Sequence, residues 1–321
     1  MDALPLLCQT PSLEFAIAVN AMTAVHPVGR FAPTPSGPLH FGSLIAALGS
    51  WLHARAQGGQ WLLRIEDLDP PREMPGAADS ILRTLEAYQL TWDGPVVYQS
   101  QRLARYAEVL QQLQQQGQCY ACDCTRAQIQ AAGGFYPGTC RERQLPLTGH
   151  AIRLRQQAPV TGFTDLHLGD VRVEGPLASE DFILRRRDGL FAYNLAVVID
   201  DADSGISEVV RGADLVEPTV RQIALYRLLQ QPVPAWLHLP LALQADGRKW
   251  SKQNHAPALP MGAAITPTLW QALTFLGQQP PAALRDDTPS ALLDWALAHW
   301  STAMLPRGDH YSAADPAAIE D

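Results

Sequence analysis

Residues 30–43 read RFAPTPSGPLHFGS, and this stretch decides how the N-terminal half of the chain folds. Residues 28–32 suit a short strand, the prolines of 33–38 force a rigid turn, and the apolar residues of 44–56 recur at helical spacing. A strand, a fixed turn and a helix N-terminus together leave backbone N–H groups pointing outward. The stretch therefore predicts an anion-binding site, although an ordinary proline-rich loop has a similar composition.

Length and composition limit the class of protein. The chain has 321 residues, of which 47% are hydrophobic, enough for a substantial core. It has no apolar run of the roughly 18 residues that a membrane-spanning helix needs. The formal net charge of −8 argues against indiscriminate coating of nucleic acid, but a local basic patch could still bind RNA.

The N-terminal segment precedes the first expected strand. Residues 1–28 contain no lysine or arginine, which both secretory and mitochondrial targeting segments need. We therefore expect a disordered extension here and a cytoplasmic location for the protein.

An α/β pattern runs through most of the chain. We expect further helices over 80–89, 101–116 and 219–230, and strands over 61–65, 182–184, 209–212 and 239–243. A Cys-, Gly- and Arg-rich region interrupts this pattern, with short alternating segments at 152–155 and 171–174. The expected organisation is a core in two halves, 29–117 and 181–260, an insertion over 118–180 and a helical region over 261–321.

Polar residues follow the expected strands. Glu66 comes directly after the strand over 61–65, and Arg211 lies on the strand over 209–212. The buried run over 193–199 is interpreted as a strand that ends in Asp200 and Asp201. Because open α/β sheets bind ligands at the carboxyl ends of parallel strands, these side chains are candidates for a substrate site.

A lysine-rich loop follows the expected strand over 239–243. Lys249 and Lys252 flank Ser251, and Gly247 provides a hinge. Two ammonium groups on such a loop could stabilise developing phosphate charge, although surface lysines usually face solvent.

Four of the five cysteines lie between positions 119 and 140. Such clustering indicates a metal site in a reducing compartment more than a disulfide framework. Taken alone, Cys119, Cys122, Cys124 and Cys140 would make a four-thiolate zinc site, and four reduced thiols without metal are the alternative.

The histidine-containing turn and the lysine loop resemble the two signatures of class I aminoacyl-tRNA synthetases. The segments LRIEDLDP (63–70), YNLAVVIDD (193–201) and EVVRGADL (208–215) resemble the glutamate-specific branch, over roughly residues 29–260. Ser43 replaces a second histidine of the first signature, and Trp250 and Gln253 depart from the second.

The length narrows the resemblance. The residues after Lys252 are too few for the anticodon-binding region of a full glutamyl-tRNA synthetase, so the chain is similar to the glutamyl-queuosine tRNA(Asp) synthetase family. The resemblance implies a Rossmann-type core with an inserted zinc-binding subdomain and a short helical C-terminal appendage. It implies ATP-dependent activation of L-glutamate, without tRNA, and transfer to queuosine in tRNA(Asp), with Mg²⁺ accompanying ATP.

Site residues also follow from the resemblance. The glutamate site would contain Arg30, Phe31, Ala32, Pro33, Thr34, Glu66, Tyr193 and Arg211. The ATP site would contain His40, Gly42, Ser43, Lys249, Ser251 and Lys252, with Lys252, His40 and Lys249 as catalytic residues. Structural zinc would be held by Cys122, Cys124, Tyr136 and Cys140, leaving Cys119 out.

Several alternatives stay open. His40 could simply cap a helix, and Arg30 could pair with Glu66. Asp200 and Asp201 are candidates for contacting queuosine, for binding metal or for capping a strand end. The best RNA-binding patch, otherwise a solvated surface, is Arg141, Arg143, Arg153, Arg155, Arg185, Arg186 and Arg187.

Alternative functions stay open as well. A minimal glutamyl-tRNA synthetase that charges tRNA(Glu) and an inactive RNA-binding paralogue are the two main ones. The chain is expected to be a monomer.

Overall fold

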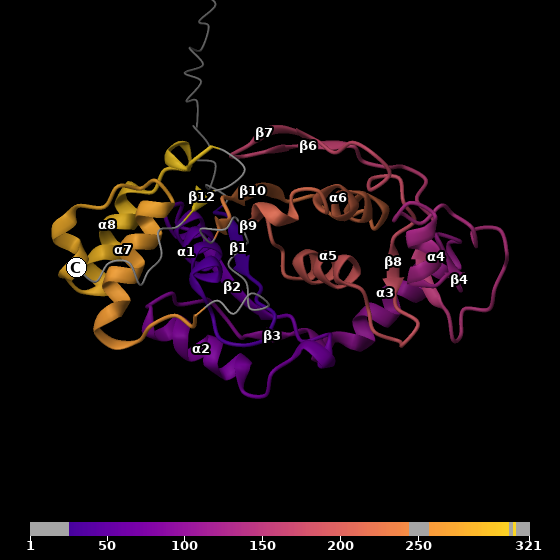
Figure 1. Cartoon of the computed structure of the whole chain (residues 1–321), viewed down its shortest axis with the longest axis horizontal. Helices are drawn as coiled ribbons and strands as arrows, with labels where there is room; N and C mark the ends of the chain where they lie inside the picture. The colour runs from indigo at the N-terminus through magenta and orange to yellow at the C-terminus, as the bar shows by residue number, and fades with distance from the viewer. Residues whose placement is uncertain (1–25, 244–256, 308–310, 313–321) are drawn as a thin grey trace, which may run out of the picture.

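The structure is a computed structural model, and it describes residues 26–243, 257–307 and 311–312. Figure 1 shows an elongated molecule with a central α/β region, a helical region at one end and a small β-containing region at the other. Lys249, Ser251 and Lys252 lie outside the described residues. Within the described residues, no helix is long and apolar enough to cross a membrane.

The first sheet of the central region contains three parallel strands. They are β1 (Val28–Phe31), β2 (Gln60–Ile65) and β3 (Val97–Tyr98). Helix α1 (Phe41–Arg55) connects β1 to β2, and α2 (Ala77–Ala87) lies between β2 and β3. The expected strands over 28–32 and 61–65 and the helix over 44–56 are thus confirmed to within a few residues.

A second sheet continues beside β1. Its strands, in spatial order, are β9 (Glu208–Gly212), β10 (Ala235–Leu239), β6 (Gly162–Asp165) and β7 (Gly169–Arg172). All its neighbouring strands are parallel except β6 and β7. The N–H of Ser207 donates to the carbonyl of Val28 at 3.0 Å, which joins the two sheets. The strand order therefore reverses between β1 and β9, and ligands bind at such switch points in open α/β sheets.

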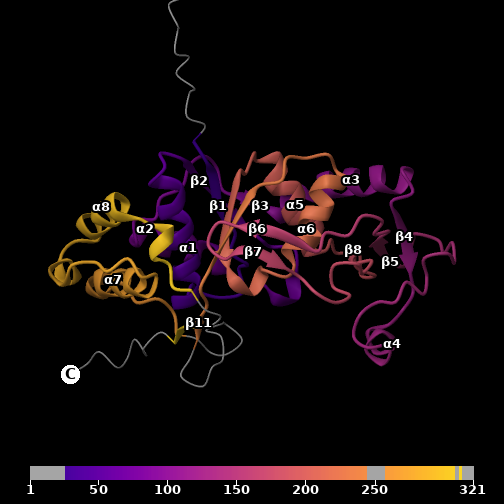
Figure 2. The ribbon, with the colours of Figure 1, turned by 90° about the horizontal axis from the view of Figure 1, so that it is seen from above.

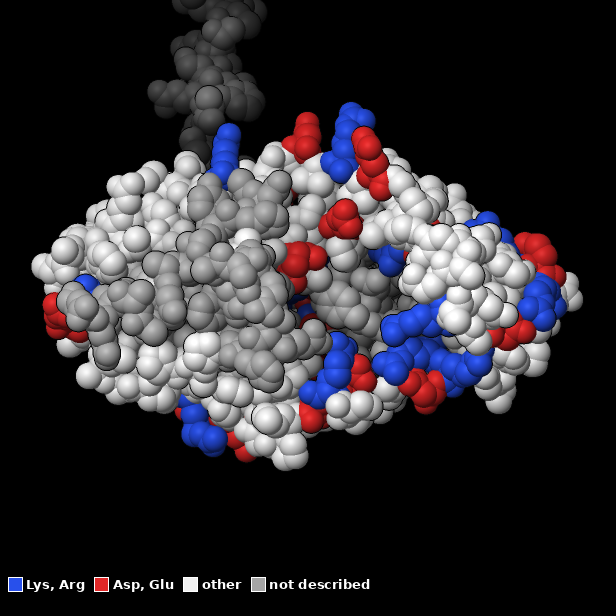
Figure 3. Space-filling view, in the orientation of Figure 1, with Lys and Arg blue, Asp and Glu red and all other residues white. Residues whose placement is uncertain are grey.

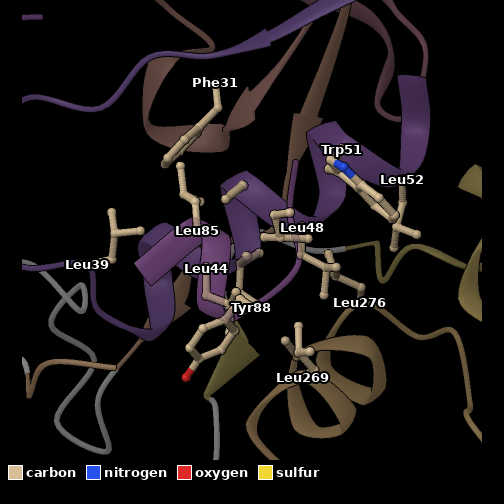
Figure 4. Close-up of a cluster of buried hydrophobic side chains, with 14 of the residues drawn as sticks. Phe31, Leu39, Leu44, Leu48, Trp51, Leu52, Leu85, Tyr88, Leu269 and Leu276 are labelled. Atoms are coloured by element: carbon tan, nitrogen blue, oxygen red, sulfur yellow. The ribbon is translucent and has the colours of Figure 1, made fainter. Parts of the chain in front are cut away.

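Helix α1 packs against one face of the strands β1, β2 and β9, and it lies at the centre of the larger hydrophobic core. Its apolar residues lie with Phe31, Leu85 and Tyr88 on one side and with Leu269 and Leu276 of the C-terminal region on the other (Figure 4). The helix begins with a capping box, in which His40 Nδ1 accepts from the Ser43 N–H at 3.2 Å and Ser43 Oγ accepts from the His40 N–H at 2.7 Å. The rigid turn therefore ends in a well-fixed helix start.

Helices α5 (Tyr193–Asp203) and α6 (Thr219–Leu228) lie on the other side of the strands from α1 (Figures 1 and 2). The interpretation of residues 193–199 as a strand is therefore wrong. Residues 195–201 are all buried. A short run that is apolar on every side has no helical periodicity to distinguish it from a buried strand.

The inserted region has its own antiparallel sheet of β4 (Cys119–Cys122), β5 (Ala151–Leu154) and β8 (Ile183–Arg185). Helix α3 (Leu103–Gln115) leads into it, and α4 (Arg126–Ala131) lies near its end (Figure 1). We expected the strand at 182–184 to return the chain to the core. It instead pairs with β5 in the antiparallel sheet of the inserted region, with Arg153 opposite Ile183.

The remaining elements complete the core. Helices α7 (Ile265–Phe275) and α8 (Pro289–His299) pack behind α1, and β11 (Ala242–Leu243) pairs in parallel with β12 (Tyr311–Ser312). The expected strand over 239–243 is interrupted, because Pro240 has no N–H to donate. Short 3-10 helices span Pro70–Arg72, Gln99–Arg102, Ala213–Leu215, Gly262–Ala264, Ala282–Asp286 and Thr302–Met304.

Candidate active site

Four of the side chains that the sequence indicated come together at the switch point between β1 and β9. Arg30 lies on β1, Glu66 directly follows β2, Tyr193 begins α5 and Arg211 lies on β9. Tyr193 is 38% exposed as a residue, but desolvation of its hydroxyl group raises the pKa of the phenol, which also responds to the charges of Arg211, Glu66 and Arg30. In the space-filling view, charged atoms lie in a hollow near the middle of this face (Figure 3).

The turn after β1 is held against the loop after β2. The Glu66 N–H donates to the Pro33 carbonyl at 3.0 Å, and the Met74 N–H donates to that of Pro35 at 2.9 Å. The Phe31 ring stacks on Trp61 in the core at a centroid distance of 6.1 Å. The Phe31 side chain therefore belongs to the core and does not face the site.

A buried network of charges orients Arg30 and Glu66. Asp201 Oδ2 accepts from Arg30 Nε at 3.2 Å and Nη2 at 3.1 Å, and Asp201 Oδ1 accepts from Arg64 Nη1 at 2.6 Å. Arg64 Nη2 in turn lies 3.4 Å from Glu66 Oε1. Arg30 thus pairs with Asp201 and not with Glu66, the alternative that the sequence left open.

The sequence did not reveal the roles of Arg64 and Asp201. Arg64 lies on β2 among apolar residues and is 3% exposed. A charged residue inside an apolar strand was the sequence signal that could have indicated a buried ion pair. Buried charges are retained in proteins where a partner of opposite charge compensates them, so Arg64 required a carboxylate.

The suggestion that Asp200 and Asp201 contact queuosine is wrong. Asp200 is 0% exposed and accepts from Gln99 Nε2 at 2.7 Å, from the Tyr106 hydroxyl at 2.8 Å and from Arg102 Nε at 2.5 Å. Because α5 is a helix on the inner side of the fold, both carboxylates face other protein side chains. Asp200 fixes α5 to α3, and Asp201 fixes it to the sheet.

Arg211 is buried, with 5% exposure, and its hydrogen-bond partners are neutral. Its guanidinium donates to His238 Nε2 at 3.2 Å, to the Tyr193 hydroxyl at 3.4 Å, to Gln222 Oε1 at 2.8 Å and to Thr219 Oγ1 at 2.7 Å. Burial lowers the pKa of its guanidinium, because removing a cation from water disfavours the charged form. Among the described residues no carboxylate forms a salt bridge with Arg211, which makes this buried cation a candidate for binding an anionic substrate group.

The predicted ATP residues that the structure describes lie at the start of α1. His40 caps this helix through Nδ1, so the capping role is real, and it leaves the predicted ATP contact untested. Ser43 Oγ donates to the His40 carbonyl at 2.7 Å, and Gly42 lies in the first turn. The proline-rich turn before α1 contributes Pro35 to a cavity of about 380 Å³, which Asp67 and Glu73 also line.

Three thiols gather in the inserted region. The sulfur atoms of Cys122, Cys124 and Cys140 all lie within 4.8 Å of one another. Tetrahedral zinc with Zn–S bonds of about 2.3 Å places its sulfurs about 3.8 Å apart, so the three thiols fit the metal. The Tyr136 hydroxyl accepts from the Cys140 N–H at 2.6 Å and belongs to the same buried cluster.

Cys119 lies on the other face of β4 from Cys122. Side chains alternate across a strand, and the three-residue separation places Cys119 against the core of α3 and α5. Burial raises the pKa of its thiol to about 11, which further disfavours the thiolate. Cys119 therefore does not lie with the other three thiols in this structure.

The arginine patch is largely paired with acids. Arg141 bonds Asp181, Arg143 bonds Asp123 at 2.8 Å and Arg155 bonds Glu142 at 2.8 Å. Arg153 is 3% exposed and stacks on the Tyr136 ring at 3.8 Å, so its predicted RNA contact is wrong. Arg186 and Arg187 are exposed on the turn after β8. Blue side chains also cluster on the half of the molecule near this turn (Figure 3).

Both the sequence and the fold of this chain are similar to those of known proteins. The family model of the class I tRNA synthetase catalytic domain for E and Q matches residues 27–134 and 139–259. The fold resembles a crystal structure of a glutamate tRNA ligase from Elizabethkingia meningosepticum in complex with its amino acid. The TM-score is 0.74 at 25% identity, covering 90% of this chain and 67% of that one. The chain thus contains a class I tRNA synthetase catalytic domain.

Curated relatives define the family more narrowly. A glutamyl-Q tRNA(Asp) synthetase from Yersinia pestis is 62% identical over 87% of this chain and 87% of its own length. Proteins of the same name from Serratia proteamaculans and Escherichia coli O157:H7 are 62% and 58% identical, each over 89% of this chain and over 94% and 92% of their own lengths. The chain belongs to the glutamyl-Q tRNA(Asp) synthetase family.

Proposed function

We propose that this protein activates L-glutamate with ATP, without tRNA, and transfers the glutamyl group to queuosine in tRNA(Asp). The observation that carries the glutamate assignment is Arg211, a buried cation held by neutral groups. The curated relatives support the tRNA substrate through their names.

The charges of the site complement glutamate. The charges of Arg30 and Arg64 are balanced by Asp201 and Glu66, whereas Arg211 has no such balance among the described residues. Glutamate carries two carboxylates and one ammonium, so it brings the missing negative charge. In this proposal Arg30 and Arg211 bind the carboxylates, Glu66 binds the ammonium, and Tyr193 limits the length of the side chain.

Activation brings two anions together. The α-carboxylate oxygen attacks the α-phosphorus of ATP, a new P–O bond forms and pyrophosphate leaves. We propose that the start of α1, with His40, Gly42 and Ser43, binds the phosphates, and that Lys249, Ser251 and Lys252, outside the described residues, stabilise the developing charge. Magnesium that accompanies ATP supplies further charge neutralisation.

Transfer completes the reaction. A queuosine hydroxyl attacks the glutamyl carbonyl of the adenylate, an alkali-labile ester forms and AMP leaves. We propose that the reaction takes place in the cytoplasm and that a monomer performs both steps.

We further propose that Cys122, Cys124, Tyr136 and Cys140 bind one structural zinc ion. The three thiols converge, and the Tyr136 hydroxyl lies with them. Zinc content measured on Cys119→Ala and Tyr136→Phe tests the fourth ligand. Tyr136→Phe should weaken zinc binding and Cys119→Ala should not; the reverse result would contradict the assignment.

One assay tests the acceptor. Labelled glutamate should appear, in an alkali-labile bond, on tRNA(Asp) that contains queuosine, and it should be absent when guanosine stands in that position. Label on tRNA(Glu) would instead identify a minimal glutamyl-tRNA synthetase. Glutamate-dependent pyrophosphate exchange without tRNA would exclude an inactive paralogue.

A further inference from the structure

A second buried acid–base pair lies behind the glutamate site and outside the residues assigned so far. Asp165 ends β6 and His238 lies on the adjacent strand β10, with 2% and 0% exposure. His238 Nδ1 and Asp165 Oδ2 are 2.7 Å apart. Such a pair is costly to bury, so its orientation needs an explanation.

The backbone fixes the orientation of the Asp165 carboxylate. Asp165 Oδ1 accepts from the N–H groups of His167 and Leu168, both at 2.9 Å, in the tight turn between β6 and β7. Oδ2 is therefore the oxygen that faces His238. A carboxylate only accepts, so His238 Nδ1 must carry the proton.

The opposite edge of the imidazole faces Arg211. Arg211 Nε lies 3.2 Å from His238 Nε2, and an arginine N–H only donates. Since Nδ1 carries the proton, the lone pair of Nε2 accepts from Arg211. Burial and the adjacent Arg211 cation lower the pKa of His238 despite the opposing charge of Asp165, which keeps the ring neutral near pH 7.

We propose that Asp165 and His238 are positioning residues that orient Arg211 for a glutamate carboxylate. Asp165 selects the histidine tautomer, and that tautomer holds Nε of the guanidinium. This inference rests on the proposed role of Arg211 in glutamate binding.

A neutral acceptor suits this position for a physical reason. A carboxylate directly against Arg211 would orient it equally well but would neutralise the charge that glutamate needs. With histidine in between, Asp165 controls the geometry while Arg211 keeps its charge for the substrate.

Asp165→Asn is the sharpest test, because it changes the tautomer with little change of shape. Two backbone N–H groups require an acceptor at Oδ1, so the asparagine NH₂ would face His238 Nδ1. His238 would then carry its proton on Nε2, opposite the Arg211 N–H, and the acceptor would be lost. In pyrophosphate exchange, the KM for glutamate should rise roughly tenfold to a hundredfold, and the KM for ATP should change less than about twofold.

Substitutions of His238 separate positioning from a general structural role. In His238→Gln the amide oxygen can reach Arg211 whatever residue occupies position 165. The Asp165→Asn penalty should therefore largely disappear in the His238→Gln background. His238→Asn, matched in chemistry but too short to reach Arg211, should raise the KM for glutamate about as much as Asp165→Asn does.

The outcomes distinguish this inference from the proposed function. If Arg211→Ala leaves the KM for glutamate unchanged, the role of Arg211 itself is wrong. If Arg211→Ala raises it but Asp165→Asn does not, the positioning role alone is overturned. A penalty for Asp165→Asn that is equal in the wild-type and His238→Gln backgrounds, or equal for glutamate and ATP, would also overturn it, with thermal melting confirming that each variant is folded.

Discussion

Asp201 shows how a single residue can hold two arginines at the glutamate site. It is 2% exposed and bonds both Arg30 and Arg64, and these cations lower the pKa of its carboxyl against the cost of burial. The family resemblance placed Arg30 and Glu66 at the glutamate site, and Glu66 also directly follows an expected strand. The sequence could not predict that Asp201 orients them, because the pairing depends on where α5 packs.

Asp201→Asn should lower the free energy of unfolding by about 3–5 kcal/mol, because two buried arginines lose their carboxylate. It should also raise the KM for glutamate. The matched control is Asp203→Asn on the same helix. The arginine partners of Asp203 are partly exposed, so losing its carboxylate should lower the free energy of unfolding by less than about 1 kcal/mol. Urea unfolding measures both, and equal losses would contradict a special role for the buried pair.

Glu66 makes glutamate binding depend on pH. Burial raises the pKa of its carboxyl above 4.5, although the Arg64 charge opposes the shift. Only the ionised form attracts the substrate ammonium, so glutamate should bind more tightly as the pH rises through this pKa. Calorimetric titration with glutamate at a series of pH values from 4.5 upward to neutrality measures the effect.

The control for this prediction is Glu66→Gln. It should bind glutamate more weakly and lose this pH dependence, whereas ionisation of the substrate's own side chain remains in both proteins. The same pH dependence in the variant would show that another group is responsible.

At the level of elements, regular periodicity was informative and uniform burial was not. The helix α1 was predicted closely because its turn and apolar spacing are local signals. Helix α5 was misread as a strand because its residues 195–201 are buried on all sides. Strand β8 was assigned to the wrong sheet, since neither its length nor its composition states which neighbour it pairs with.

The end of α7 offers a test at this scale. Gly277 has φ of +74°, and a Cβ there would lie 2.1 Å from the Met304 carbonyl oxygen. Gly277→Ala should therefore separate α7 from the segment at Met304. It should lower the free energy of unfolding by at least about 2 kcal/mol more than placing an alanine in the left-handed conformation does by itself.

Gly262→Ala is the matched control for this change. Gly262 has φ of +68°, with nothing within 4 Å of the added Cβ. It should cost only about 1 kcal/mol, the penalty of the left-handed conformation. Thermal unfolding of the two variants separates contact from conformation, and equal shifts would show that the close approach at Gly277 is unimportant.

Over the whole molecule, the acidic net charge of −8 requires any tRNA contact to be local. Acid partners occupy Arg141, Arg143 and Arg155, and Arg153 is buried. Arg186 is also paired, with Asp188 at 2.6 Å and Asp69 at 3.5 Å, but Arg186 and Arg187 are both exposed and adjacent, and we expect this pair to contact tRNA. Arg187 Nη2 also donates to the Asp123 carbonyl at 2.6 Å, so the proposed zinc site and this pair are connected.

Replacing both Arg186 and Arg187 with alanine should weaken binding of queuosine-containing tRNA(Asp). It should also reduce the dependence of that binding on salt concentration by the equivalent of about one to two phosphate contacts. Pyrophosphate exchange should be unchanged, because neither residue lies among the glutamate or ATP residues. Arg172→Ala, an exposed arginine on β7, is the control and should leave both activities as they are. An equal loss in the control would mean that only overall charge matters.

The sequence by itself determined what depends on neighbouring residues. The proline-rich turn before α1, the polar residues that follow β2 and occupy β9, and the clustered cysteines were all legible in it, because short-range sterics and spacing produce them. Only the tertiary structure decided which distant residues meet: Asp201 with Arg30, and Asp165 with His238 and then Arg211. These pairings join residues as far as 171 positions apart, and packing of whole elements, which no local pattern encodes, sets the distances between them.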